Sequence, residues 1–308
     1  MAEHIYAYLP RPAMSPLGDG RSVYALPVAG APLWRHIAAA HAAHTDGAAH
    51  FVVADPALQR DAGAMEAIAK FGATGTASPD GAALEPSAGG FFPSRDGRRL
   101  PLELPWQLLD VMQEILSGVP AGVSPDAEVE PGVEISGNVR IEAGAHVFGG
   151  ARIKGDVYIG ANVVVGNGAL IRGATSIAAD GVAGFSAEVK NSLLGEACGV
   201  GPLAFVADSL LERNCFLGGT ARISNYRLDG ADVAMEIDGR RRSTGRRQFG
   251  AVLGPAVRVG IGAVLYPGRK IGANCLIGPG VNVTRNLDPD LRVEIRQELD
   301  IRALHTGA

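Results

Sequence analysis

The sequence predicts a mainly β protein organised around a parallel β-helix, because an aliphatic residue returns at every sixth position through its middle. A helix repeats every 3.6 residues and a strand every two, so a period of six indicates a solenoid of short strands and tight turns. The unbroken part of this ladder consists of Val123, Val129, Ile135, Ile141, Val147, Ile153, Ile159, Val165, Ile171 and Ile177. We therefore predict a hexapeptide β-helix.

Two further observations agree with this prediction. Two positions before most ladder residues stands a small or β-branched residue, such as Ala127, Val139 or Ala151, which suits the crowded interior of a narrow coil. Glycine is frequent, with 42 residues, and only 6% of the residues are aromatic. This composition suits a chain rich in turns.

The ladder is disturbed in the second half of the chain. It shifts by one residue at Leu194 and again at Leu211, stops over residues 224–248, and resumes from Leu253 to Val283. The interruption carries five arginines, namely Arg240, Arg241, Arg242, Arg246 and Arg247. Solenoids place insertions on one face, which is often the binding face, so we expect function near this excursion.

The first 118 residues predict a small α/β domain. Strands and helices alternate there as β-α-β-α, an order that favours a parallel layer. The expected elements are a strand at 5–9, a helix at 32–43, a strand at 51–54, a helix at 57–71, a loop or linker at 72–99 and an amphipathic helix at 105–116. The β-helix domain then spans residues 119–287.

The last segment, residues 288–308, is predicted to hold a C-terminal helix and a tail. It begins with Asp288-Pro289, and Leu291, Ile295 and Leu299 follow at helical spacing. A helix here would cover the open end of the coil.

Composition excludes several classes of partner. The net charge is −4 and the pI is about 6.0, which gives no reason to expect nucleic acid or an acidic membrane surface. We find no signal peptide and no apolar run long enough to span a membrane, so we expect a cytoplasmic protein. Cys198, Cys215 and Cys275 lack metal or disulfide spacing and are expected to be buried thiols; no metal site is predicted, and His146 is interpreted as a surface residue.

Four motifs carry a resemblance to a known family. They are E-V-K-N-S (188–192), V-A-D-S (206–209), S-N-Y-R-L-D (224–229) and G-R-R-R-S-T-G-R-R-Q-F-G-A (239–251). Together they resemble the acetyltransferase half of bifunctional sugar-1-phosphate nucleotidylyltransferase/acetyltransferases, including glucosamine-1-phosphate acetyltransferases. The resemblance implies a left-handed β-helix, a homotrimer, and acetyl-CoA bound between coils of two subunits.

The N-terminal part resembles the nucleotidyltransferase half of the same family in truncated form. Residues 15–33 are similar to the opening signature, but the loop before them, Leu9-Pro10-Arg11-Pro12-Ala13-Met14, contains no glycine. Prolines lack the N–H groups that would bind a triphosphate. We therefore expect nucleotidyl transfer to be lost, with residual activity of this kind as one alternative.

The resemblance also implies site residues. Arg172 and Lys190 match positions that bind the substrate phosphate, and Asn225 matches a site asparagine. The residues that correspond to the CoA-binding backbone are Gly219, Ile261 and Gly278. Other positions depart from the pattern: Pro202 replaces the histidine that removes the proton from the amine, Phe205 replaces a neighbouring tyrosine, and Ala231 and Ala234 replace two lysines.

These residues support an acetyl-CoA-dependent N-acetyltransferase acting on an amine-type nitrogen of a small molecule. Glu188 is the candidate replacement base, and a less basic acceptor nitrogen would reduce the need for a base. Each residue also has a structural explanation: Glu188 and Lys190 as solvated surface, Arg172 as an ion-pair partner, Asn225 as a turn residue. The arginines of the excursion are candidates for contact with CoA phosphates, for a solvated loop or for a subunit contact. A catalytically silent trimeric scaffold is the alternative from another class.

Overall fold

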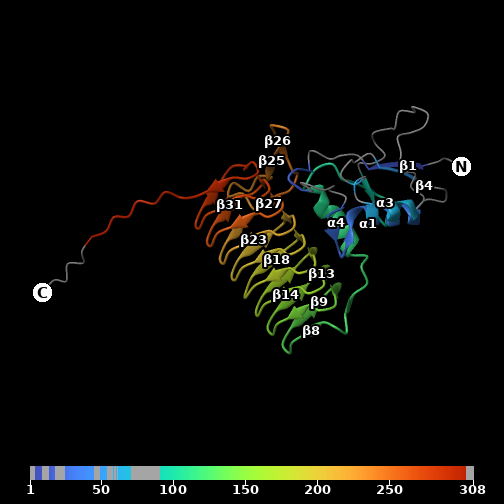
Figure 1. The fold of residues 1–308 in the computed structure, drawn as a ribbon, viewed down its shortest axis with the longest axis horizontal. Helices are drawn as coiled ribbons and strands as arrows, with labels where there is room; N and C mark the ends of the chain where they lie inside the picture. Colours follow the sequence, from blue (N-terminus) through green and yellow to red (C-terminus); the bar gives the residue numbers. More distant parts are fainter. Residues whose placement is uncertain are drawn as a thin grey trace.

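The computed structural model describes residues 4–8, 14–17, 25–44, 49–53, 58, 60, 62–70 and 91–302. Its dominant feature is a prism of three parallel sheets, through which the chain winds from Gly122 to Val293 (Figure 1). Successive strands along the chain belong to successive sheets, as a β-helix requires. The predicted left-handed parallel β-helix is therefore confirmed.

Each sheet runs the length of the prism. Sheet 1 comprises β7 (Gly122–Val123), β10 (Val139–Ile141), β13 (Val157–Ile159), β16 (Thr175–Ile177), β19 (Leu193–Leu194), β22 (Leu210–Leu211), β27 (Ala251–Leu253) and β30 (Arg269–Ile271). Sheet 2 comprises β8 (Glu128–Val129), β11 (His146–Val147), β14 (Val164–Val165), β17 (Val182–Ala183), β20 (Gly199–Val200), β23 (Phe216–Leu217), β28 (Arg258–Val259), β31 (Leu276–Ile277) and β33 (Arg292–Val293). Sheet 3 comprises β9 (Glu134–Ser136), β12 (Arg152–Lys154), β15 (Leu170–Arg172), β18 (Glu188–Lys190), β21 (Phe205–Ala207), β24 (Arg222–Ile223), β29 (Val264–Leu265) and β32 (Asn282–Val283).

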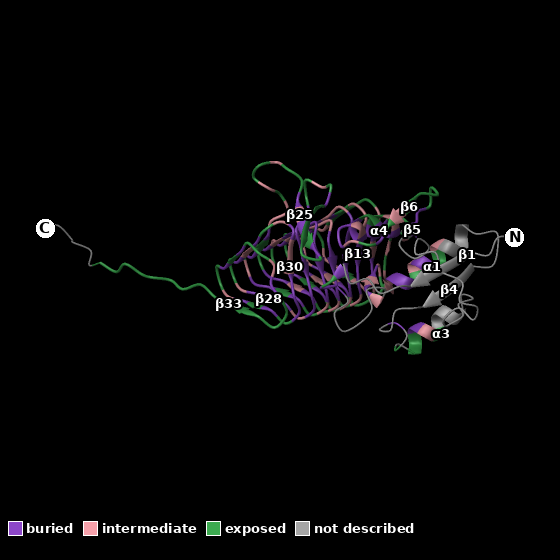
Figure 2. Cartoon of the chain, turned by 90° about the horizontal axis from the view of Figure 1, so that it is seen from above, coloured by how far each residue is buried: buried purple, intermediate pink, exposed green. Residues whose placement is uncertain are grey.

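The ladder residues fill the interior of the prism. From Ile141 to Leu265 they are fully buried or nearly so, and they form one continuous core (Figure 2). Because side chains alternate along a strand, each buried ladder residue directs its immediate neighbours outward. The interior supplies stability, and the outer faces remain for binding.

Both shifts of the ladder occur at one corner of the prism. Between sheet 3 and sheet 1 the ladder advances by six residues from Ile171 to Ile177, but by five from Val189 to Leu194 and from Val206 to Leu211. The excursion leaves the prism at the same corner, between β24 and β27. We call this edge the 3–1 corner, and the edge that follows sheet 2 the 2–3 corner.

The excursion folds as an antiparallel hairpin, which sequence analysis did not predict. Its strands are β25 (Ala234–Ile237) and β26 (Arg240–Ser243). Met235 and Ile237 are buried in a second hydrophobic cluster beside sheet 1. The hairpin is therefore anchored to the prism by its apolar side.

The N-terminal elements lie on the side of sheet 1 (Figure 1), and the last of their helices packs on its outer face. They are β1 (His4–Tyr8) and β4 (Ala49–Val53), which pair in parallel, the pair β2 (Pro27–Val28) and β3 (Ala31–Pro32), the helices α1 (Leu33–His44), α3 (Ala62–Lys70) and α4 (Gln107–Leu116), and the hairpin β5 (Phe91–Pro93) and β6 (Arg99–Pro101). Leu108 and Met112 of α4 join Tyr158 and Val252 of sheet 1 in the second cluster.

Most expected N-terminal elements are present within a few residues of the predicted bounds. The expected loop at 72–99 instead includes β5 and the start of β6, and its residues up to 90 lie outside the described part. The expected proline-containing loop at residues 9–13 also lies outside it. The division into domains at residues 118 and 287 stays a prediction.

The predicted C-terminal helix is wrong for the residues that the structure describes. Residues 287–293 add a last partial coil, in which Leu287 bridges to Ile271 and β33 pairs with β31. Residues 294–302 then leave the solenoid as an extended, exposed segment (Figures 1 and 2). The edge of β31 provides backbone hydrogen-bond partners for an added strand. A helix here would have no apolar surface to pack against among the described residues, and Leu299 is 69% exposed.

Among the described residues, no helix has both the length and the apolar character needed to cross a membrane.

Candidate functional site

Three of the predicted site residues lie side by side on the outer face of sheet 3. Arg172 and Lys190 are partners in the register between β15 and β18, and Glu188 precedes Lys190 by two residues on the same side. Arg172 donates from Nε to Oε1 of Glu188 at 2.8 Å, and its terminal nitrogen lies 2.6 Å from the same oxygen. The structure therefore pairs the expected phosphate-binding arginine with the expected base.

A buried carboxylate organises the 3–1 corner. Asp208 is 4% exposed and accepts three side-chain hydrogen bonds: from Lys190 Nζ at 3.2 Å, from Asn191 Nδ2 at 3.0 Å and from Asn225 Nδ2 at 2.6 Å. Lys190 also donates to Oε1 of Gln248 at 2.7 Å. We call these five residues the Asp208 cluster.

The backbone at this corner explains the residue types found there. Asn191 and Asp208 have φ values of 44° and 49°, in the left-handed region that Asn and Asp tolerate better than most residues. The N–H of Asp208 bonds to the carbonyl of Lys190, and the N–H of Gly250 bonds to the carbonyl of Asp208. Successive coils thus stack at the corner and hold the cluster in place.

The hairpin completes the cluster from the other side. A β-bridge joins Tyr226 to Gln248 at its base, and the N–H of Phe249 donates to the carbonyl of Asn225 at 2.9 Å. Asn225 and Gln248 are thereby brought together although the excursion separates them in sequence. The excursion that stops the ladder supplies two of the five residues.

The predicted CoA-binding residues lie at the 2–3 corner. Gly219 and Ile261 occupy the same turn position in successive coils, and the N–H of Gly262 bonds to the carbonyl of Gly219. Among the described residues, the N–H groups of Gly219 and Ile261 have no hydrogen-bond partner, whereas that of Gly278 donates to Val293 at 2.8 Å. Two of the three candidates therefore present free donors.

Pro202 stands at this same turn position, one coil before Gly219. The N–H of Thr220 donates to the carbonyl of Pro202 at 2.8 Å, which stacks the two turns. In the neighbouring coils, the N–H groups of Gly219 and Ile261 at this turn position have no hydrogen-bond partner among the described residues. Proline, which has no N–H, therefore fits here without loss of a hydrogen bond. Pro202, which the resemblance aligns with a histidine, is thus compatible with the fold.

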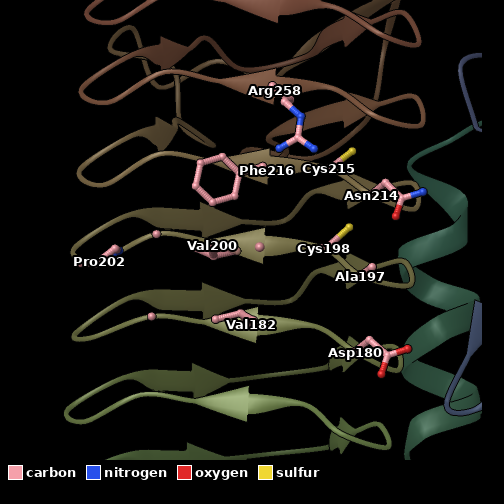
Figure 3. Close-up of a pocket in the computed structure, with 13 residues that line it drawn as sticks. Asp180, Val182, Ala197, Cys198, Val200, Pro202, Asn214, Cys215, Phe216 and Arg258 are labelled. Atoms are coloured by element: carbon pink, nitrogen blue, oxygen red, sulfur yellow. The ribbon is translucent and has the colours of Figure 1, made fainter.

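A groove with a volume of 520 Å³ runs across the outer face of sheet 2 beside Pro202. Val182, Gly199 and Phe216 line it on successive coils, with Arg258 one coil further; Figure 3 labels Val182, Phe216 and Arg258. Figure 3 shows Pro202 at one margin of the groove and Asp180 and Asn214 at the other. Phe216 is 43% exposed, so the groove offers an apolar surface to a ligand or a partner.

One chain does not bring all predicted site residues together. Pro202 precedes β21 and Asp208 follows it, so the two corners lie at opposite ends of the strands of sheet 3. Arg172, Glu188, Lys190 and Asn225 belong to one group, and Gly219, Ile261 and Gly278 to the other.

The arginines of the excursion have different surroundings. Arg246 forms an ion pair with Asp110 of α4, and Arg240, Arg241 and Arg242 are exposed. Near the hairpin, burial lowers the pKa of the Arg269 guanidinium, and the charges of Arg241 and Arg227 lower it further. Of these arginines, Arg246 has an evident structural role, because it joins the excursion to α4.

Sequence analysis missed Asp208, Asn191 and Gln248 as functional candidates. All three lie within the motifs that carried the resemblance, and Asp208 is the only acidic residue of V-A-D-S. That position in the motif was the available signal. Their convergence depends on contacts between coils, which a linear motif does not display.

Comparison with known proteins agrees with the fold. The family model described as bacterial transferase hexapeptide (six repeats) matches residues 250–285. A bifunctional sugar-1-phosphate nucleotidylyltransferase/acetyltransferase from Sulfurisphaera tokodaii is 34% identical over 166 residues, which cover 54% of this chain and 41% of the relative.

Two other relatives also match part of the chain. The bifunctional protein GlmU of Methanococcus maripaludis is 46% identical over 51% of this chain and 38% of the relative. The uncharacterized acetyltransferase YaiX of Escherichia coli is 39% identical over 38% of this chain and 50% of the relative. The chain thus spans half or less of the length of these relatives.

Solved structures resemble the chain only distantly. A perosamine N-acetyltransferase from Caulobacter crescentus, solved with CoA and GDP-perosamine, is 15% identical with a TM-score of 0.21, over 84% of this chain and 70% of that one. The polysialic-acid-specific acetyltransferase NeuO is 16% identical with a TM-score of 0.28, over 60% of this chain and 91% of that one. Similarities of this size support no argument about function.

Proposed function

We propose that this chain, which belongs to the hexapeptide-repeat β-helix family, is a CoA-dependent N-acyltransferase. In this proposal it transfers an acetyl group from acetyl-CoA to an amine-type nitrogen of a small molecule. Relatives that carry acetyltransferase in their names match part of this chain, and the matched model of transferase hexapeptide repeats lies within the solenoid, which supports acyl transfer.

The observation that carries the proposal is the convergence of four motifs on the Asp208 cluster. Lys190 and Asn191 come from the first motif, Asp208 from the second, Asn225 from the third and Gln248 from the fourth. These motifs are separate in sequence, and their polar side chains form one hydrogen-bonded group. A shared site explains why all four are present together.

The chemistry needs a nucleophilic nitrogen, a held thioester and an acceptor for one proton. The nitrogen lone pair attacks the thioester carbonyl carbon, the C–N bond forms, the C–S bond breaks, and CoA leaves as the thiol after protonation. Free backbone N–H groups such as those of Gly219 and Ile261 suit the thioester oxygen as its negative charge develops. No particular side chain is required for that role.

Glu188 is proposed to accept the proton from the attacking nitrogen. A carboxylate is a weak base, so it accepts this proton only after the C–N bond has begun to form. The acceptor nitrogen must then be neutral before it attacks, which favours a weakly basic nitrogen such as that of a hydrazine, a hydroxylamine or an aminosugar. Before an acceptor binds, Arg172 holds the Glu188 carboxylate in place.

A phosphate on the acceptor would compete for the same cations. Arg172 is 40% exposed at its side chain and is paired with one carboxylate oxygen, so it can exchange Glu188 for a phosphate. Lys190 is only 13% exposed and is held by Asp208 and Gln248, which suits a structural role within the site. We therefore propose that Arg172, rather than Lys190, binds the phosphate of the acceptor.

We also propose that the chain acts as a homotrimer. The Asp208 cluster and the free N–H groups of the 2–3 corner lie at opposite edges of sheet 3, so a second copy is needed to bring one of each together. The outer face of sheet 2 carries exposed apolar residues, including Val182, Phe216 and Leu276, and offers a surface for such a contact.

A silent scaffold is the second candidate, and specific observations favour it. Pro202 replaces the usual base, and both retained cations are already neutralised by carboxylates within the chain. A protein that used this site only for binding would retain the Asp208 cluster, because the cluster shapes the site.

Calorimetric titration of the full chain with acetyl-CoA tests the proposal. We expect saturable binding, followed by CoA release when a weakly basic amine is added. Binding without release across a panel of amines would select the scaffold instead. Absence of binding at millimolar acetyl-CoA would remove the acyltransferase proposal.

A further inference from the structure

A second polar cluster lies on sheet 2, three coils away from Pro202 and outside the site described above. Glu128 and His146 are register partners in β8 and β11, and Glu130 follows Glu128 by two residues. Val147 is fully buried, so its neighbour His146 points outward, and Glu128 and Glu130 flank the partly buried Val129 in the same way. All three side chains therefore share one outer face.

These side chains converge closely. His146 Nε2 lies 3.2 Å from Oε1 of Glu130, and His146 Nδ1 lies 3.7 Å from Oε2 of Glu128. One ligand atom from each residue can be chosen so that all three lie within 4.8 Å of one another. Among the described residues, this is the one group of His, Cys, Asp and Glu side chains close enough to hold an ion.

We propose that Glu128, Glu130 and His146 form a binding site for a divalent transition-metal ion, with Zn²⁺ as the reference ion. One imidazole nitrogen and two carboxylate oxygens form a mixed ligand set that suits Zn²⁺ and its neighbours, whereas Ca²⁺ and Mg²⁺ prefer oxygen ligands throughout. The two negative charges match the charge of the ion. Because Glu128, at this end of sheet 2, is 70% exposed at its side chain, water can take the remaining position.

Two contacts hold the ligands ready. The N–H of Gly149 donates to Oε2 of Glu130 at 2.8 Å, which leaves Oε1 directed at His146. The ring of Phe148 stacks on the imidazole with centroids 3.9 Å apart and planes 13° apart, which fixes the orientation of His146. Contacts of this kind, which orient metal ligands from behind, raise the affinity of metal sites.

The spacing fits a metal with little rearrangement. With bonds of about 2.1 Å, ligand atoms at the corners of a tetrahedron lie about 3.4 Å apart. The pair Glu130 and His146 already has this spacing. Glu128 must move closer, and its side chain is 70% exposed and free to do so.

Protonation of His146 would stabilise the same arrangement without a metal, so the experiment must separate the two explanations. The backbone hydrogen bond from Gly149 and the hydrogen bond from His146 lower the pKa of Glu130. A metal ion differs from a proton in that a chelator removes it at constant pH, so the experiment compares the chelator-treated protein before and after the ion is added.

The test is titration of the chelator-treated full chain with ZnCl₂ at pH 7.5, followed by calorimetry and by the NMR signals of the His146 ring. We expect one class of site in the micromolar range, with the His146 ring signals shifting as it fills. His146→Ala and Glu130→Gln should each weaken this site at least tenfold, and thermal melting checks that both variants fold. Glu134→Gln, in an exposed pair with Arg152 on the adjacent sheet, is the matched control and should leave binding unchanged.

Two results would overturn the proposal. One is the absence of zinc binding up to about 1 mM. The other is zinc binding that is identical in the protein and in both variants, with the His146 ring signals unmoved, which would place the ion elsewhere on the chain.

Discussion

Removal of the charge on Asp208 should destabilise the whole solenoid. We choose Asp208→Asn because asparagine keeps the size of the side chain and tolerates the positive φ of this position. The substitution places an amide where three donors converge and leaves the ammonium group of Lys190 without its carboxylate. The exposed fractions of the two side chains are only 6% and 13%, so water replaces little of the lost interaction.

The magnitude follows from this burial. Loss of one partner from a buried ion pair costs about 3–5 kcal/mol. Lys190 retains its bond to Gln248, so we expect the lower end, about 3 kcal/mol. With a shift of roughly 2–4 °C per kcal/mol in a domain of this size, the melting temperature should fall by about 6–12 °C.

Differential scanning calorimetry of four variants measures this effect: Asp208→Asn, Lys190→Met, the double variant and the control Glu134→Gln. Glu134→Gln breaks a pair whose side chains are 59% and 58% exposed, and it should not change the melting temperature measurably. Lys190→Met combined with Asp208→Asn should lose less stability than the sum of the single changes, because the two groups are coupled. A melting temperature for Asp208→Asn within 2 °C of the unmodified protein would refute the reasoning.

Two further predictions concern single side chains. Glu188→Gln should lower the rate of CoA release by about 10²-fold or more while the affinity for acetyl-CoA stays the same, since a positioned proton acceptor contributes at least this much; an unchanged rate would eliminate Glu188 from the reaction. Burial raises the pKa of the Cys215 and Cys275 thiols, and Cys198 is equally inaccessible, so the folded protein should react slowly with a thiol reagent at pH 8. Unfolding in guanidinium should expose all three thiols to rapid reaction, and rapid reaction before unfolding would contradict the structure.

The fold was largely predictable because its main signal is periodic. The ladder predicts the prism, and each shift at Leu194 and Leu211 corresponds to a shortened turn at the 3–1 corner. The C-terminal segment was mispredicted because Leu291 and Ile295 also fit a helical spacing. The free edge of β31, which decides the outcome there, belongs to another part of the chain.

The candidate site was predictable only in part. Arg172, Glu188, Lys190 and Asn225 were found through motif positions, and the structure places them along one face and one corner. The central role of Asp208 could not be read from V-A-D-S, because its three donors come from coils and a hairpin that the fold brings together. His146 was similarly interpreted as surface, since its two glutamates become neighbours only when β8 and β11 pair.

The most direct test of the central claim is the titration of the full chain with acetyl-CoA, with free acetate as the control ligand. The acyltransferase account predicts saturable binding of acetyl-CoA and no binding of acetate. Gly219→Pro removes the free N–H of Gly219 at the 2–3 corner and should weaken the affinity for acetyl-CoA. This variant suits the fold, because Pro202 already occupies the equivalent turn position one coil earlier. No saturable binding of acetyl-CoA at millimolar concentration would contradict the account.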